Sequence, residues 1–199
     1  MQQLENFYKT LQKGISNMSQ IEKIISHEMT HIENEKEYTK ETLSTLSSCE
    51  NLFPENLGLI GQTVMDDANG KINEQANPFK NFYYHVLGVK ADMTSFIEAY
   101  ELLLKYKTKE KDIENKIQTI TQQNGDATKL AALNQDLPCV QFIINSCVYR
   151  LNIDSEKFKK DQINCYNEEI FQLKEEIIVY EQFIEKLWNN FTVTEYRFN

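Results

Sequence analysis

The residues best suited to chemistry are two histidines that flank a glutamate in the segment His27-Glu28-Met29-Thr30-His31. Two histidines one helical turn apart can bind one zinc ion, and a glutamate between them can act as general base on the zinc-bound water. Glu50 or Glu55 could supply a third ligand. The segment therefore has to be tested as a metal site.

Ile24 to His31 resembles the active-site helix of thermolysin-type zinc proteases. Those enzymes set this helix beneath a sheet whose edge strand aligns the peptide, and this chain has no strand-like alternation. Glu33 follows with no glycine-containing extension to a third histidine, and His85 lies in an aromatic run. We therefore expect a protein that is not an enzyme, with no catalytic residues, metal site or cofactor. Adventitious zinc binding by His27 and His31 stays open.

Basic residues gather in two runs, Lys105, Lys107, Lys109 and Lys111 in the first and Arg150, Lys157, Lys159 and Lys160 in the second. With a turn centred near residue 130, position 105 lies opposite about 156 on antiparallel helices, and the runs form one basic belt. Each basic residue near an anionic membrane contributes about 1 kcal/mol, so the belt predicts a membrane-binding surface. The alternative is a solvated face whose lysines pair with acidic neighbours.

Two apolar seams predict the helices that must position these residues. Both seams repeat at alternating spacings of three and four residues, which keeps one side of a helix facing its partner as in a coiled coil. Their members are Phe79, Phe82, Val86, Val89, Met93, Phe96, Tyr100 and Leu103 in the first, and Tyr166, Ile170, Leu173, Ile177, Tyr180, Ile184, Leu187 and Phe191 in the second. We expect an all-α protein of long packed helices.

The expected helices lie in one domain, 1–199. The first covers about 2–75 with a break near Pro54, because a proline removes a backbone donor and disfavours helix before it. The second covers about 78–123, with Pro78 in its first turn and Asn124-Gly125-Asp126 after its end. The third covers about 138–191, from Pro138 onward.

Further apolar residues beside the seams make the helical faces wider than one neighbour covers. We expect the widest faces to form a dimer interface that includes Phe82, Tyr83, Val86, Phe96, Ile177, Phe183, Leu187 and Trp188. The alternative is that the first helix covers these residues within one chain.

The composition of the chain limits its expected binding partners and its expected location in the cell. The net charge of −9 argues against indiscriminate nucleic-acid binding, and we expect no nucleic acid as partner. The chain shows no apolar stretch long enough to span a bilayer, so we expect a soluble, cytoplasmic protein. Cys49, Cys139, Cys147 and Cys165 form no C-x-x-C pair and are expected to be reduced and buried.

The order of these features resembles the BAR domain of sorting nexins. The similarity lies in a kinked first helix, an asparagine-rich junction before a Phe/Tyr-rich second helix, and the third-helix segment Arg150 to Lys160 with Tyr166 and Trp188. The resemblance implies an elongated antiparallel three-helix coiled coil that dimerises into a curved six-helix bundle. The lipid-binding PX domain of that family has no counterpart here.

From the same resemblance, the expected function is membrane-curvature sensing or remodelling in endosomal trafficking. It implies peripheral location on endosomal membranes, a homodimer or a heterodimer with a related BAR protein, an anionic membrane surface, and trafficking-coat proteins as further partners. The alternative function is a coiled-coil scaffold or tether that never binds lipid. The acidic residues of the chain keep that alternative open.

Overall fold

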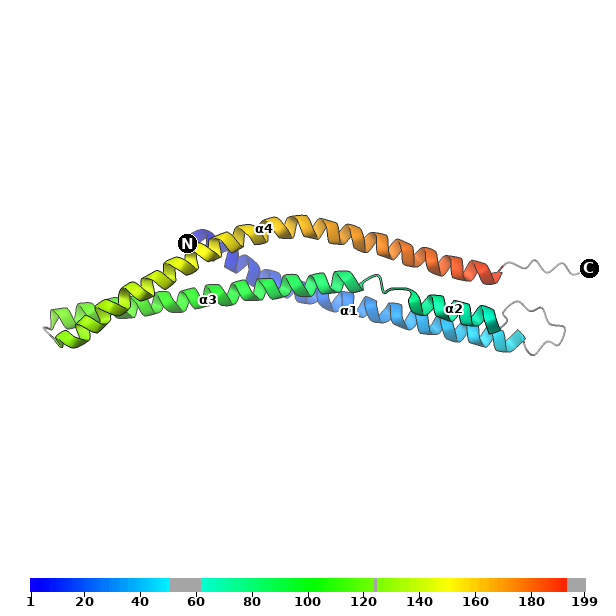
Figure 1. Ribbon diagram of the computed structural model, residues 1–199, viewed down its shortest axis with the longest axis horizontal. Coiled ribbons are helices and arrows are strands. Elements are labelled where there is room, and N and C mark those ends of the chain that lie inside the picture. Colours follow the sequence, from blue (N-terminus) through cyan, green and yellow to red (C-terminus); the bar gives the residue numbers. More distant parts are fainter. Residues whose placement is uncertain (51–61, 124, 193–199) are drawn as a thin grey trace, which may run out of the picture. The chain divides into compact units, whose positions relative to one another are not determined.

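The structure, a computed structural model, describes residues 1–50, 62–123 and 125–192, and it contains helices and no strand over these residues. The helices are α1 (Gln2–Glu50), α2 (Gln62–Glu74), α3 (Lys80–Gln122) and α4 (Ala127–Thr192) (Figure 1). The expectation of an all-α protein is therefore confirmed. The break expected near Pro54 lies outside the described residues, between α1 and α2.

The chain divides into two compact units, and α1, α3 and α4 each run from one unit into the other. Unit 1 comprises residues 1–19 and 88–165, and unit 2 comprises residues 20–87 and 166–199. Each unit has its own hydrophobic core.

The core of unit 1 is a three-helix packing centred on the first apolar seam. Leu4 and Leu11 of α1, Phe96 of α3 and Val140 of α4 are all buried in it. The seam spacing of α3 explains this core, because every seam residue from Phe82 to Leu103 is at most 8% exposed. The apolar seam predicted from the sequence is thus the buried side of α3.

Direct contacts in unit 1 give the helix directions. The ring of Phe7 lies 4.9 Å from that of Phe96, and the ring of Tyr8 lies 4.6 Å from that of Tyr100. Gly14 faces Met93, and a side chain on the glycine would reach to within 2.5 Å of the methionine methyl group. From Tyr8 to Gly14 the numbers rise along α1, whereas their contacts on α3 fall from Tyr100 to Met93. These two helices are therefore antiparallel. The short connection after α3 makes α3 and α4 antiparallel too (Figure 1).

Unit 2 has a smaller core, formed where α1, α2 and α4 meet. Leu43 of α1, Ala68 and Ile72 of α2 and Leu187 of α4 are buried together, with Phe183 and Trp188 packed against them. We expected residues 62–74 to belong to one kinked first helix. They form a separate helix, α2, that packs beside α1 (Figure 1).

The start of the last helix was predicted wrongly. We expected it at about 138, whereas α4 begins at Ala127 and Pro138 lies inside it. Asp126 explains the earlier start, because its Oδ1 accepts hydrogen bonds from the backbone N–H groups of Thr128 at 2.9 Å and Lys129 at 3.3 Å. This is an N-cap, and Leu133 and Leu137 then pack onto the core of unit 1, which stabilises the first turns ahead of the proline.

The ends of α3 agree with the sequence analysis. Asn77 Oδ1 accepts a hydrogen bond from the Phe79 N–H at 3.1 Å, and its backbone oxygen accepts one from Lys80 N–H at 3.1 Å, so Pro78 lies in the first turn. At the other end, the Gly125 N–H donates to the Ile120 carbonyl at 2.9 Å, which satisfies one of the last carbonyls of the helix.

If Asp126 starts α4, Asp126→Ala lowers the free energy of unfolding by about 1 kcal/mol, because two backbone donors lose their acceptor. Urea denaturation followed by circular dichroism measures the change. Asp136→Ala is the matched control, since Asp136 is exposed inside the same helix and its replacement leaves stability unchanged or slightly higher. Equal losses in both variants would contradict the capping role.

Candidate functional site

The predicted basic residues of α3 are available at the surface. Lys105, Lys109 and Lys111 are exposed and Lys107 is half-buried. No carboxylate of the described chain lies within ion-pairing distance of their ammonium groups. At about 100° per residue, Lys105 and Lys109 lie on one side of α3 and Lys107 and Lys111 on another. These four residues therefore surround the helix and do not form a single face.

The two basic runs are offset along α3 and α4 from the level arrangement that the belt assumed, and membrane binding by their residues stays a prediction. Ile120 lies near Lys129 and Ala99 lies near Leu151, so facing positions of α3 and α4 sum to about 249. Position 105 therefore lies opposite about 144 and not 156, a shift of about 18 Å along the helices at 1.5 Å per residue. The cause is the earlier start of α4: α3 ends at Gln122 and α4 begins at Ala127, so the helices meet before the turn expected near residue 130.

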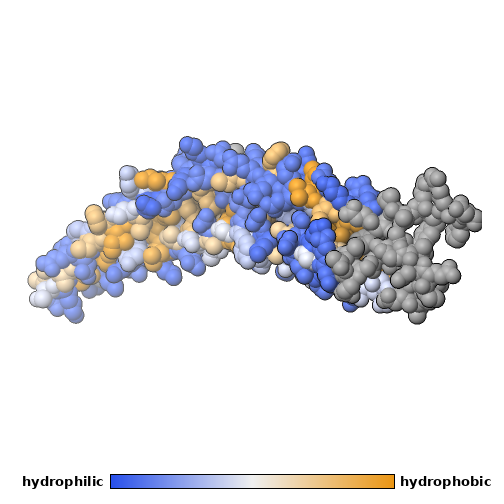
Figure 2. Space-filling model, turned by 45° about the vertical axis from the view of Figure 1, so that its right-hand side comes forward, coloured by the Kyte–Doolittle hydropathy of each residue, from blue (hydrophilic) through white to orange (hydrophobic). Residues whose placement is uncertain are grey.

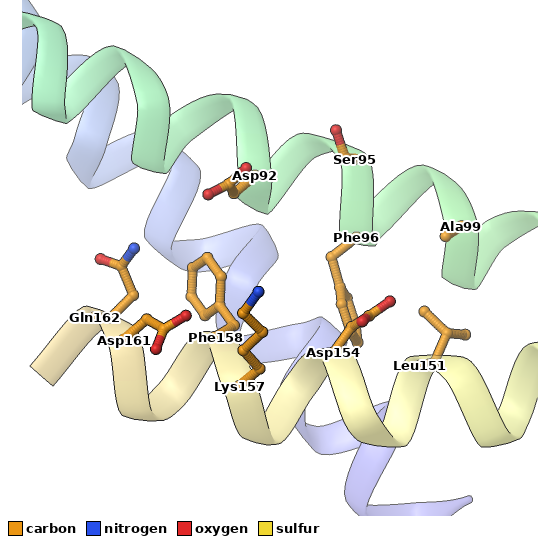
Figure 3. A pocket seen from close by; sticks show the side chains of 10 residues that line it. All are labelled: Asp92, Ser95, Phe96, Ala99, Leu151, Asp154, Lys157, Phe158, Asp161 and Gln162. Atoms are coloured by element: carbon orange, nitrogen blue, oxygen red, sulfur yellow. The ribbon is translucent and has the colours of Figure 1, made fainter.

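Lys157 lies in an acidic hollow between α3 and α4. The hollow has a volume of about 340 Å³, and its lining includes Asp92, Asp154 and Asp161 together with Phe96 and Phe158. In Figure 3, the Lys157 side chain extends into the space between these carboxylates. Lys157 is exposed and forms no ion pair with the described residues, but the carboxylates around it reduce its attraction for an anionic surface.

Two more members of the second run are paired within α4. Arg150 Nε lies 3.0 Å from Asp154 Oδ2, and Lys159 Nζ lies 2.7 Å from Glu156 Oε1. The Lys159 ammonium group also lies 5.2 Å above the ring of Phe7. Lys160 is exposed and forms no ion pair with the described residues. Two of the four residues of the second run are thus paired, whereas none of the run on α3 forms an ion pair with the described residues.

The eight predicted interface residues differ in exposure. Phe82, Val86, Phe96 and Leu187 are buried within the chain, and their side chains belong to its own packing. Tyr83, Ile177, Phe183 and Trp188 are half-buried. Contact of the eight residues with a partner chain stays a prediction. The four half-buried residues keep exposed surface that a partner would cover.

The second apolar seam is incompletely covered. Of its described side chains, only Tyr180 and Leu187 are buried, whereas Tyr166 is 51% exposed and Ile170 is 39% exposed. Phe171 and Val179, beside the seam, are exposed as well. Figure 2 shows how hydrophobic residues reach the surface between hydrophilic ones on one face of the molecule. The sequence predicts this seam, but the spacing alone does not show which of its members stay exposed.

An acidic groove, missed by the sequence analysis, lies along this seam in unit 2. It is lined by Glu28, His31, Ile32, Glu35, Pro78, Phe79, Ile177, Tyr180, Glu181, Ile184 and Glu185 and has a volume of about 450 Å³. The Tyr180 hydroxyl donates a hydrogen bond to Glu35 Oε2 at 3.2 Å. Burial, and then the negative charge of Glu35, raise the pKa of Tyr180 far above its usual value, so this hydroxyl stays protonated.

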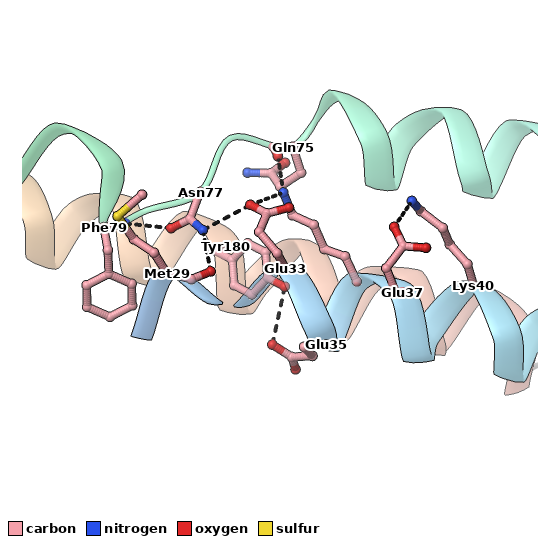
Figure 4. A network of polar contacts seen from close by, with 10 residues as sticks. Met29, Glu33, Glu35, Glu37, Lys40, Gln75, Asn77, Phe79 and Tyr180 are labelled. Carbon is pink, nitrogen blue, oxygen red and sulfur yellow. Dashed lines mark hydrogen bonds and ion pairs between the residues drawn. The ribbon is translucent and has the colours of Figure 1, made fainter. Parts of the chain in front are cut away.

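A polar network fixes one wall of the groove (Figure 4). Asn77, 9% exposed, donates hydrogen bonds to the Met29 carbonyl at 2.9 Å and to Glu33 Oε1 at 2.9 Å. Buried Lys36 donates to the Gln75 carbonyl at 2.7 Å and lies 3.4 Å from the same Glu33 oxygen. Because Asn77 also caps α3, the network holds the Pro78–Phe79 turn against α1.

The network also shifts the ionisation of Glu33. Burial alone raises the pKa of Glu33, but the hydrogen bond from Asn77 and the charge of Lys36 outweigh it and hold the pKa below its usual value. A lowered pKa in the folded state stabilises the fold above the usual glutamate pKa of about 4.3, and this contribution is lost as the pH falls further.

The His27–His31 segment lies on α1, where the His27 side chain is 79% exposed and its Nδ1 lies 3.6 Å from Glu28 Oε1. Within the described chain, no three metal-binding side chains come together. The Glu50 side chain and Glu55, the candidate third ligands, lie outside the described residues. Glu28 and His31 instead line the acidic groove.

Two further expectations concern cysteines and membranes. Cys139, Cys147 and Cys165 are free thiols as expected, but Cys139 and Cys165 are exposed, so the expectation of burial is wrong for both. The Cys49 side chain lies outside the described residues. None of the described helices has the length and apolar character that crossing a bilayer requires.

Comparison with known proteins identifies the fold. No protein-family model matches the chain, and no curated protein matches it. Among solved structures, the chain is similar to the crystal structure of a BAR protein from Galdieria sulphuraria, with a TM-score of 0.60 and 12% sequence identity. The similarity covers 96% of this chain and 96% of that chain. The expectation of a BAR-like all-α fold is confirmed.

Replacing the amide that holds the groove wall tests the network. Asn77→Ala lowers the free energy of unfolding at pH 7 by about 2 kcal/mol, because a helix cap and buried hydrogen bonds are lost together. The deficit shrinks as the pH falls below the usual glutamate pKa of about 4.3 and Glu33 becomes protonated, last in the wild type, where its pKa is lowered. Urea denaturation at pH 7 and pH 3 measures both effects.

Asn81→Ala is the matched control for this experiment. Asn81 is exposed and makes one hydrogen bond, to Glu176 Oε1 at 2.8 Å, so its loss costs less than about 0.5 kcal/mol. An Asn77→Ala protein as stable as the control would show that the network does not hold the turn.

Proposed function

We propose that this protein is a non-enzymatic, membrane-associated module that senses or stabilises membrane curvature. The observation that carries the proposal is the fold shared with a BAR protein over almost the whole length of both chains. The finer expectation, a sorting-nexin-like role on endosomal membranes with trafficking-coat proteins as partners, rests on the sequence resemblance and is part of the same proposal.

The lysines of α3 support membrane contact better than those of α4. Lys105, Lys109 and Lys111 are exposed and form no ion pair with the described residues, so their charge is free to attract anionic lipid. Each contributes about 1 kcal/mol near such a surface. Attachment by a few such residues is weak and sensitive to salt.

The partly exposed second seam supports assembly with a helical partner. In a coiled coil, seam residues pack between the residues of a facing helix. Ile177 and Trp188 are half-buried and Ile170 is exposed, so a partner helix has apolar surface to cover in unit 2. We propose this face as the surface for the expected homodimer or heterodimer.

A helical scaffold or tether without lipid binding is the second candidate. The pairing of Arg150 with Asp154 and of Lys159 with Glu156 favours it, as does the net charge of −9. These charges are satisfied within the chain and leave less attraction for anionic lipid.

Vesicle binding separates the two candidates. At low salt, the protein co-sediments with vesicles that contain phosphatidylserine, binds small vesicles more tightly than large ones, and dissociates as salt is raised. Lys105→Gln with Lys109→Gln weakens binding about tenfold or more, because two free charges on one side of α3 are lost.

The control pair is Arg150→Gln with Lys159→Gln, which removes two paired charges and weakens binding much less. A wild-type protein that leaves anionic vesicles in solution at low salt would refute the membrane proposal and favour the scaffold. Equal effects of the two pairs would refute the assignment of the contact to α3.

A further inference from the structure

The acidic groove of unit 2 combines an apolar floor with a charged rim. The floor is formed by Ile32 of α1, by Phe79, and by Ile177, Tyr180 and Ile184 of α4. Ile32 and Tyr180 are buried and the others are half-buried. The floor residues of α4 belong to the second seam, so the groove is part of the surface that a helical partner is proposed to cover.

The spacing of the lining residues fits a helix lying along the groove. Glu28, Ile32 and Glu35 follow at steps of four and three on α1, and Ile177, Tyr180 and Ile184 follow at steps of three and four on α4. Such steps place residues in a line along one side of each helix. A third helix can therefore pack between these lines and cover the apolar floor.

The rim carries negative charge without compensation. Glu28, Glu35, Glu181 and Glu185 line the groove, and the lining contains no lysine or arginine. Over the described residues, these carboxylates form no ion pair with a lysine or arginine. His31, which is exposed, is the lining group that can become cationic.

A second copy of the same face is a poor occupant for this groove. In a two-fold dimer whose axis passes through the groove, the rim of one copy faces the rim of the other. Like charges brought together at an interface cost several kcal/mol and suppress such pairings. A basic helix avoids this cost, because lysine and arginine stems cover apolar surface while their charged ends reach the carboxylates.

We propose that the acidic groove selects a helical partner whose apolar stripe is bordered by lysine or arginine, in preference to a second copy of this face. The inference rests on the proposed assembly through the second seam and names the chemistry of the partner. In the partner, basic residues occupy the positions beside the seam, where charges set the choice of partner in coiled coils.

A charge-reversed copy of this chain serves as the probe. The variant carries Glu28→Lys, Glu181→Lys and Glu185→Lys, and it retains Glu35 because that carboxylate accepts the hydrogen bond from Tyr180. Sedimentation equilibrium measures association of the wild type alone, the variant alone and their equimolar mixture, at 50 and 500 mM salt. Far-ultraviolet circular dichroism confirms that the variant is folded.

The expected result is that the mixture associates at least about tenfold more tightly than either protein alone at low salt, and that the advantage shrinks at high salt. The control variant carries Glu41→Lys, Glu74→Lys and Glu168→Lys, exposed positions of unit 2 outside the groove that change the net charge equally. The mixture of this control variant with the wild type gains much less in the strength of association.

Three results would overturn the inference. Wild type that associates alone as tightly as the mixture, without salt dependence, would make a second copy the occupant and leave the proposed assembly standing. A control mixture that gains as much would show a general charge effect. Absence of association in every mixture would refute docking at this face, whereas vesicle binding by the wild type tests the membrane function separately.

Discussion

The burial of one apolar seam on α3 is the interaction on which the rest of the structure depends. Seam residues from Phe82 to Leu103 are buried, and the contacts of Phe7 with Phe96 and of Tyr8 with Tyr100 bring α1 onto the same helix. A spacing that averages 3.5 residues keeps this seam inward over many turns. Because α1 and α4 both pack on α3 in unit 1, the position of every surface charge there follows from this packing.

The same spacing has a different outcome on the last part of α4. There the chain buries Tyr180 and Leu187 but leaves Tyr166 and Ile170 exposed, and the groove beside them is rimmed by glutamates. Free lysines lie in unit 1, on α3, whereas the acidic groove lies in unit 2. The two proposals therefore concern different units: the proposed contact with anionic lipid lies in unit 1, and the proposed contact with a basic helical partner lies in unit 2.

Periodicity predicted the helical class, the seam of α3 and the two ends of α3, because these depend on local patterns of apolar residues, proline, asparagine and glycine. The start of α4 escaped prediction, since Pro138 is a strong local signal against helix while the cap at Asp126 and the packing of Leu133 act with it only in the folded chain. That error shifted the expected facing positions of α3 and α4, and with them the expected alignment of the two basic runs. The acidic groove escaped prediction because Glu28 and Glu185 come together only when α1 packs on α4.

The central claim is that the chain fills the seam of α3 by itself and leaves the seam of α4 to a partner. Oxidative footprinting of two tyrosines tests it, since Tyr100 is 3% exposed and Tyr166 is 51% exposed. In dilute solution, hydroxyl radicals should modify Tyr166 readily and leave Tyr100 intact, and assembly with a partner should protect Tyr166. Equal protection of both tyrosines in the dilute monomer would contradict the account.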